Sequence, residues 1–138
     1  MSKEIPTILA LDVGEQRLGI AIASGDVKFA RPLTTLANSE KFIDDIENLI
    51  EEHNIDTLVI GLPRGLDGQE TNQTTAVREF ARKLANKVSI PFVFQDEALT
   101  SVKAEAELNK SRKAYNRGDI DALAATYILE DYIVENMR

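Results

Sequence analysis

The chain has 138 residues, enough for one domain and too few for two domains of ordinary size. Hydrophobic residues make up 43% and charged residues 28%, as in a globular protein, and there is no cysteine, which excludes a disulfide framework and a thiolate metal site. A formal net charge of −7 argues against a general nucleic-acid coating protein. No apolar run approaches about 18 residues and the first residues do not resemble a signal peptide, so we expect no membrane association.

The first third of the chain is predicted to form a β-meander. Residues 7–12 and 18–24 have the apolar character of strands, and their short connection favours an antiparallel hairpin. Residues 28–33 follow a Gly-Asp turn and are predicted as a third strand. Residues 40–53 have helical periodicity, and Ser39 is placed to cap that helix. Residues 40–56 hold seven acids and one Lys, which is typical of a solvated helix face.

The remaining two thirds alternate strands and helices. Strands are predicted at residues 57–61 and 91–95, and helices at residues 74–87, at about 100–109 and at about 120–136. Strand–helix–strand crossovers imply parallel pairing and right-handed connections. The predicted fold class is therefore α/β, with a five-stranded mixed sheet in which an antiparallel meander and two parallel strands are flanked by helices. We expect residues 1–138 to form a single domain.

Asp12 is the most unusual charge in this pattern. It ends an apolar run and precedes a turn flanked by Gly14 and Gly19. A carboxylate at the end of a buried strand costs several kcal/mol unless something compensates it. Asp96-Glu97 follows the last predicted strand, and Asp121 lies within the first turn of the last predicted helix. Because parallel strands end at one edge of a sheet, we expect the three acidic positions to converge.

Converging carboxylates favour a divalent metal site. They cannot all stay ionised without a cation, and hard ions prefer such oxygen ligands. Two ions about 4 Å apart can activate water and stabilise the leaving oxygen of a phosphodiester. His53, the only histidine, excludes a His-based zinc set and offers no support for a Ser-His-acid triad.

Each acid also has a simpler interpretation. Asp12 could cap the hairpin turn, Asp96-Glu97 could be a polar loop, and Asp121 could complement a helix dipole. The spacing Asp12-x-Gly14-x-x-x-x-Gly19 also matches the phosphate-binding hairpin of actin-like and sugar-kinase ATPases. Those enzymes need two such subdomains, and 138 residues hold one, so an ATPase is disfavoured.

Four motifs occur in order along nearly the whole chain. They are Leu11-Asp12-Val13-Gly14 with Arg17-Leu18-Gly19-Ile20-Ala21; Val59-Ile60-Gly61-Leu62-Pro63 with Leu66-Asp67-Gly68 and Arg78-x-Phe80-Ala81; Asp96-Glu97-x-Leu99-Thr100-Ser101 with Ala104-Glu105; and Asp121-Ala122-Leu123-Ala124-Ala125 with Ile128-Leu129. Together they resemble the pre-16S rRNA nuclease family, also called YqgF or RuvX, the Holliday-junction-resolvase-like proteins.

This resemblance implies an RNase H-like nuclease domain in a cytoplasmic bacterial protein. The implied activity is two-metal-ion hydrolysis of phosphodiester bonds at the 5′ end of the 16S rRNA precursor. Asp12, Glu97 and Asp121 match the family's catalytic metal ligands for Mg²⁺ or Mn²⁺. The implied partner is nucleic acid, with an rRNA precursor favoured over a DNA junction, and the expected state is a monomer or weak homodimer.

Two positions depart from the family pattern and remove positive charge. Ala98 stands where the family usually has Arg, and Asp119 stands where it often has a basic residue; Asp119 could instead be the N-cap of the last helix. These departures keep two alternatives open, a Holliday junction resolvase acting on DNA and a non-catalytic nucleic-acid or ribosome-associated module. Residues 108–118 contain no acid and four basic residues, and form either a polar loop or a phosphate contact. The candidate nucleic-acid contacts are Arg17, Arg64, Arg112, Lys113 and Arg117.

Overall fold

The computed structural model describes residues 6–24, 29–65, 67–97 and 117–136. Five strands form one sheet in the order β3-β2-β1-β4-β5. The strands are β1 (Ile8–Val13), β2 (Arg17–Ala23), β3 (Arg31–Ala37), β4 (Thr57–Pro63) and β5 (Phe92–Glu97). β2 pairs antiparallel with β1 and β3, whereas β4 pairs parallel with β1 and β5. The predicted mixed sheet, a meander plus two parallel strands, is confirmed.

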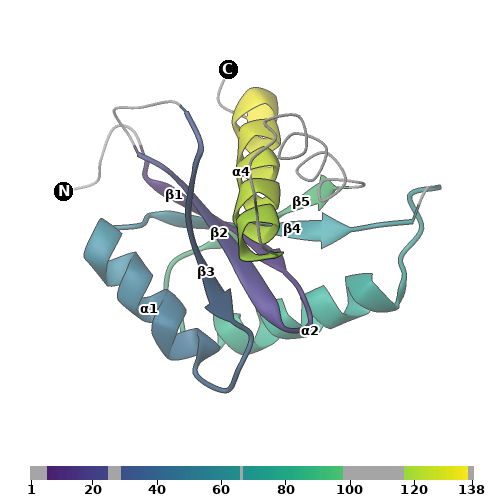
Figure 1. Cartoon of the computed structure of the whole chain (residues 1–138), viewed down its shortest axis with the longest axis horizontal. Helices are drawn as coiled ribbons and strands as arrows, with labels where there is room; N and C mark the ends of the chain where they lie inside the picture. Colours follow the sequence, from purple (N-terminus) through teal and green to yellow (C-terminus); the bar gives the residue numbers. More distant parts are fainter. Residues whose placement is uncertain (1–5, 25–28, 66, 98–116, 137–138) are drawn as a thin grey trace.

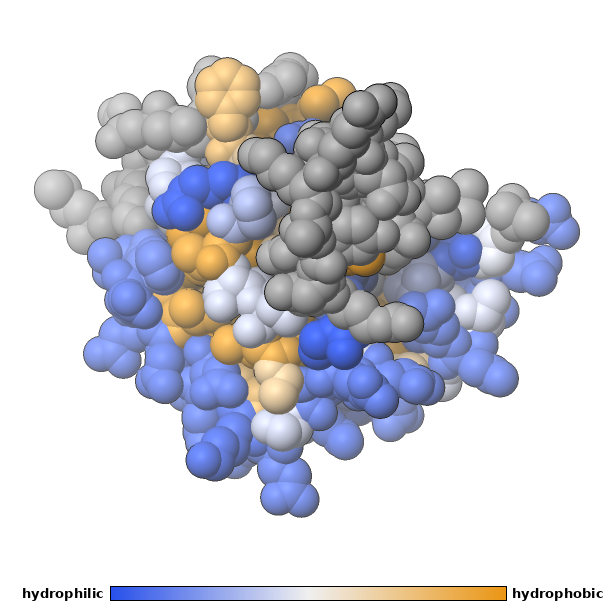
Figure 2. All heavy atoms as spheres, in the orientation of Figure 1, coloured by the Kyte–Doolittle hydropathy of each residue, from blue (hydrophilic) through white to orange (hydrophobic). Residues whose placement is uncertain are grey.

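Helices cover both faces of this sheet. α1 (Phe42–His53) and α2 (Asn72–Ala85) lie on one face, and α4 (Arg117–Asn136) crosses the other (Figure 1). None of the helices in the described ranges combines the length and low polarity that a bilayer crossing requires. Hydrophilic residues gather over α1 and along the lower edge of the molecule (Figure 2), as expected for the acid-rich segment at residues 40–56.

Strand alternation divides the hydrophobic core into two layers. Successive side chains of a strand point to opposite faces of the sheet. Leu9 and Leu11 of β1 therefore pack toward α1 and α2, whereas Ile8 and Ala10 pack toward α4. The α4 layer is rich in small residues, which lets the helix approach the sheet closely. Its buried small residues include Ala21, Ala23, Ala122, Ala124 and Ala125.

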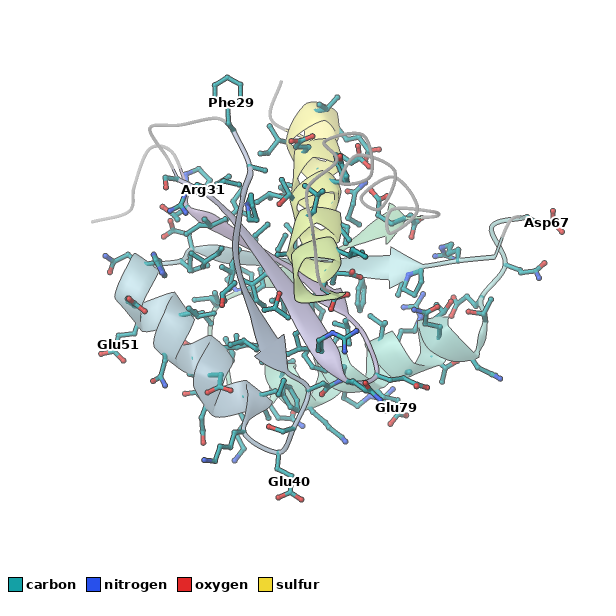
Figure 3. The ribbon with its side chains drawn as sticks, in the orientation of Figure 1. Phe29, Arg31, Glu40, Glu51, Asp67 and Glu79 are labelled. Atoms are coloured by element: carbon teal, nitrogen blue, oxygen red, sulfur yellow. The ribbon has the colours of Figure 1, made fainter. Side chains whose placement is uncertain are left out.

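β3 is the largest correction to the predicted elements. It starts three residues later than expected and extends through Ala37, while Phe29, 72% exposed, lies before it (Figure 3). The expected pattern was weak because β3 is an edge strand, where Pro32 is tolerated and side chains are half-exposed. A register shift between Ile20 and Ala21 of β2 also interrupts its pairing with β3.

The predicted starts of all three described helices were also wrong, and α2 begins at Asn72, two residues before the expected start. α1 begins at Phe42, where Lys41 is the N-cap residue, and Ser39 instead accepts a 3.3 Å hydrogen bond from the Lys41 N–H. α4 begins at Arg117, so Asp119 is not its N-cap and Asp121 lies beyond its first turn. The helix expected at about residues 100–109 lies outside the described residues.

Candidate active site

The β1–β2 hairpin presents Asp12 at the edge of the sheet. The Gly14 N–H donates to the Arg17 carbonyl at 2.9 Å and closes the turn. Asn38 braces the turn from the end of β3, since its side-chain amide donates to the Gly14 carbonyl at 2.7 Å and its backbone N–H donates to the Gln16 carbonyl at 2.9 Å. Among the described residues, the hydrogen bonds that hold this turn come from the backbone and from the side chain of Asn38.

The side-chain alternation of β1 places Asp12 on the α4 face. Asp12 continues the row formed by Ile8 and Ala10, and in the β1–β2 register it lies opposite Gly19. A Cβ added to Gly19 would overlap the carbonyl oxygen of Asp121 and come within 3.0 Å of the Ala122 nitrogen. The missing side chain of Gly19 therefore lets α4 pack against β2 at the point that brings Asp121 beside Asp12.

The two carboxyl groups form an electrostatically costly pair. Burial, and to a lesser extent the negative charge of Asp121, together raise the pKa of Asp12 from its usual value of 3.8 to about 6. Asp121 in turn accepts a 2.7 Å hydrogen bond from Arg17 Nε, between side chains that are 21% and 33% exposed. Arg17 and Asp121 line a hollow of about 570 Å³ together with the turn residues Gly14, Glu15 and Gln16. The guanidinium of Arg17 is thus already paired with Asp121, and a polar hollow lies beside it.

The structure separates the two acids at the end of β5. Gln95 donates a 2.8 Å hydrogen bond to Glu135 of α4, so its side chain lies on the α4 face. Alternation places Glu97 on that face as well, the face of Asp12, and places Asp96 on the other. Asp96 accepts a 3.0 Å hydrogen bond from Arg64 Nε. Of the Asp96-Glu97 pair, Glu97 is therefore the residue that shares a face and an edge with Asp12.

The three predicted acids do not form a closed cluster. Within the described ranges, no group of three or more His, Cys, Asp or Glu side chains is arranged to hold a metal ion. Asp12 and Asp121 are brought together, whereas Glu97 lies two strands away across β4. The oxygen chemistry of the pair fits a hard divalent ion, and Glu97 completes a set of three only if its side chain turns toward them.

Arg64 lies in a network of charges near the end of β4. Besides Asp96, it contacts Glu70 at 3.8 Å. Glu70 binds Arg78 through two hydrogen bonds of 2.9 and 3.0 Å, which hold the pKa of Glu70 below its usual value. The loop between β4 and α2 carries Asp67 at its tip, pointing away from the sheet (Figure 3). Arg64 is thus balanced by acids, whereas Arg17 lies directly at the carboxyl pair.

The other predicted contacts are not placed by the structure. Arg112 and Lys113 lie outside the described residues, and Arg117 is the first residue of α4, with its side chain outside them. The bracing role of Asn38 was not predicted. No sequence signal marks it, because Asn38 and the turn carbonyls it bonds lie more than 20 residues apart along the chain.

The family of the chain is shown by its similarity to known proteins. The RuvX family model, described as Holliday junction resolvase, matches residues 6–135. A relative from Crocosphaera subtropica, named as a pre-16S rRNA nuclease, is 39% identical over 129 residues, which cover 91% of this chain and 90% of the relative. A relative of the same name from Orientia tsutsugamushi is 44% identical over 127 residues, covering 89% and 80%.

Solved structures support the same fold. RuvC from T. thermophilus in complex with a Holliday junction substrate aligns with a TM-score of 0.58 at 12% identity, covering 96% of this chain and 97% of that one. Fowlpox virus resolvase in complex with Holliday junction DNA aligns with a TM-score of 0.55 at 9% identity, covering 96% and 99%. The predicted RNase H-like fold is confirmed. The chain belongs to the RuvX family of nucleases, enzymes that hydrolyse phosphodiester bonds.

Proposed function

We propose that this chain is a single-domain nuclease that cleaves the 16S rRNA precursor near its 5′ end, with Mg²⁺ or Mn²⁺ held by Asp12, Asp121 and Glu97. The observation that carries the proposal is the partly buried carboxyl of Asp12 beside Asp121 at the hairpin edge, with its pKa raised to about 6. Such a pair is costly in the free protein and is relieved by a cation. The names of the relatives support RNA as the substrate.

The residues of the site divide the work between holding ions and positioning phosphate. Asp12, Asp121 and Glu97 would hold the divalent ions, and Asp12 lies between Asp121 and the β4–β5 side of the sheet. Divalent ions, when bound, supply activation of water and stabilisation of charge on the leaving oxygen. Arg17, whose Nε lies 2.7 Å from the Asp121 carboxylate, is the cationic side chain of this site that would contact the scissile phosphate. The Asn38 brace holds the hairpin turn beside these residues.

A cleavage assay tests the proposal. Purified protein is incubated with a structured RNA that spans the 5′ end of the 16S precursor, with Mg²⁺, with Mn²⁺ and with EDTA. We expect metal-dependent cleavage that Asp12→Asn abolishes. RNA binding with no cleavage under any metal condition contradicts the proposal and supports a non-catalytic module.

A Holliday junction resolvase is the second candidate, because the matching family model carries that description. A four-way DNA junction in the same assay separates the two. Paired, symmetric nicks in the junction, made with a higher kcat/KM than cleavage of the RNA, would show that DNA rather than RNA is the substrate. A resolvase must also present two sites, so its active form would be a dimer in sedimentation analysis.

The assignment of Glu97 rather than Asp96 predicts opposite results for two neighbouring substitutions. Glu97→Gln is expected to lower kcat by at least about 100-fold, since even outer-sphere partners of a metal are worth 10- to 100-fold. Asp96→Asn is expected to stay within about threefold of wild type, because it removes only an exposed ion pair with Arg64. Single-turnover cleavage with saturating Mn²⁺ measures both. Equal losses of kcat in the two variants, or a larger loss in Asp96→Asn, would show that the assignment of Glu97 as the ligand is wrong.

Arg17 is expected to have opposite effects on metal and RNA. Arg17→Gln frees Asp121 from its cation, so Mn²⁺ binding should strengthen by about fivefold. RNA binding should weaken by about tenfold, because a phosphate loses a charged donor. Calorimetry with Mn²⁺ and RNA binding in Ca²⁺ measure the two effects. Arg82→Gln, at an exposed position of α2, is the control and should change neither; parallel weakening of both in Arg17→Gln would indicate a merely structural role.

A further inference from the structure

A second hollow lies on the other side of the hairpin turn. It has a volume of about 550 Å³ and is formed between the end of β1, the end of β3 and the first half of α2. Its apolar wall includes Val13, Val77 and Phe80, which belong to the core layer under α1 and α2. Phe80 is fixed by stacking on Phe42, with ring centroids 4.5 Å apart. This wall is pre-formed, and the hollow is large enough for a single flat ligand.

The rim of this hollow has the chemistry of base recognition rather than phosphate binding. Three amide side chains line it, those of Asn38, Asn72 and Gln73, and Asn38 is oriented by its hydrogen bond to Gly14. Amides offer a donor and an acceptor side by side, the pattern that pairs with base edges. The described residues that line the hollow include no Lys or Arg, and they include the acid Glu15, so a phosphate would find no cation there.

The hollow adjoins the catalytic edge. Gly14 and Glu15 line both hollows, so the turn is a wall between them. Asp12 lies only two residues before Gly14, about 7 Å along an extended strand. A nucleic-acid strand that crosses the hairpin can thus place a phosphate on the side of Asp12 and Asp121 and an adjacent base on the other side.

We propose that this hollow binds one unstacked nucleobase of the RNA strand, next to the phosphate that is cleaved. The proposal rests on the proposed function, since it takes RNA as the strand that crosses the hairpin. Extruding a base costs least where RNA is single-stranded, so the hollow directs cleavage to unpaired nucleotides. The apolar wall accepts the face of the base and the amides read its edge.

Binding of abasic RNA to a non-cleaving protein tests the base pocket directly. The probe is a single-stranded RNA from the precursor 5′ end, in which one abasic nucleotide is moved through every position. Removing the base at one position of the RNA should weaken its binding to the Asp12→Asn protein by about tenfold, which is the effect expected for the loss of one base contact. Ala76→Leu fills the hollow from the exposed side of α2 and should make intact and abasic RNA bind equally. Ala85→Leu, on the same helix but outside the hollow, should keep the tenfold difference.

A second variant keeps the test valid if Ala76→Leu disturbs the folding of α2. Gln73→Ala removes one amide at an exposed position and should reduce the abasic penalty to about threefold. The base pocket is overturned if no position shows a penalty, or if the full penalty persists in both variants. Cleavage of intact RNA by the wild-type protein is measured separately. Cleavage without a base penalty overturns the pocket alone, and a base penalty without cleavage overturns the proposed function alone.

Discussion

Asp12→Asn is expected to abolish cleavage and at the same time to stabilise the metal-free fold. Ionised Asp12 is held in a partly buried position beside Asp121, and its pKa of about 6 lies roughly 2 units above the usual value. Each unit corresponds to about 1.36 kcal/mol, so the charged carboxyl costs the native state roughly 3 kcal/mol. Asparagine removes the charge and keeps the shape. At pH 8 without metal, we expect unfolding at a temperature several °C higher, read by circular dichroism.

The sign of the pH dependence of stability identifies the charge of Asp12 as the cause of the expected difference between wild type and Asp12→Asn. Between pH 4 and pH 6 the native state binds more protons than the unfolded state, so wild-type stability falls as pH rises through this window. The Asp12→Asn variant lacks this loss of stability. Its higher free energy of unfolding relative to the wild type should therefore be fully developed above pH 6 and absent below pH 4. Saturating Mn²⁺ should then stabilise the wild type and not the variant.

Asp44→Asn is the control for these measurements. It removes an exposed carboxylate from α1 and should have no comparable effect at any pH. An unfolding temperature for Asp12→Asn below that of the wild type at pH 8 would contradict the explanation, because it would mean that the ionised carboxylate stabilises the fold.

Asp12 was predictable because its signal is local. An acid that interrupts an apolar run and precedes a glycine turn is visible in eight residues, and β1 and β2 form where that pattern places them. The choice between Asp96 and Glu97 was not predictable from the same reasoning. It depends on how far β5 extends, and a strand that ends at residue 95 leaves both acids in a loop, whereas the observed strand runs through Glu97. One boundary therefore decides which carboxyl faces α4.

The sequence predicted that Asp12 and Asp121 approach each other, but not which side chains form hydrogen bonds between distant segments. The ion pair between Arg17 and Asp121 joins residues 104 positions apart, and nothing in either motif specifies it. The same holds for Asn38, whose neighbours in the chain give no reason to expect a brace on the hairpin. The local pattern thus located the acids that we propose as metal ligands, whereas their ion pairs and pKa values depend on packing.

Gly19 gives the sharpest test of how packing builds the site. Glycine at this position of the hairpin suggests close approach of a ligand phosphate, but in the structure the space is taken by the backbone of α4 at Asp121. Gly19→Ala must push that backbone away, since neither a carbonyl oxygen nor a peptide nitrogen can rotate aside. Overpacking of this kind costs about 1–3 kcal/mol, and a shift of about 1 Å in a catalytic group can cost 100-fold in rate. We expect Gly19→Ala to lower cleavage and Mn²⁺ affinity by about 100-fold.

Gly61→Ala is the matched control, because Gly61 also faces α4. Its Cβ would meet the terminal Cδ1 and the Cγ1 of Ile128, a side chain that can change rotamer, and the contact lies two helical turns from Asp121. It should lower stability to a similar or smaller extent while keeping cleavage within about fivefold of wild type. If the two variants lose stability equally but only Gly19→Ala loses metal binding, the glycine opposite Asp12 acts by setting the separation of two carboxyls. If Gly19→Ala keeps full Mn²⁺ affinity and loses only RNA binding, the phosphate explanation is correct and α4 does not determine the geometry of the metal site.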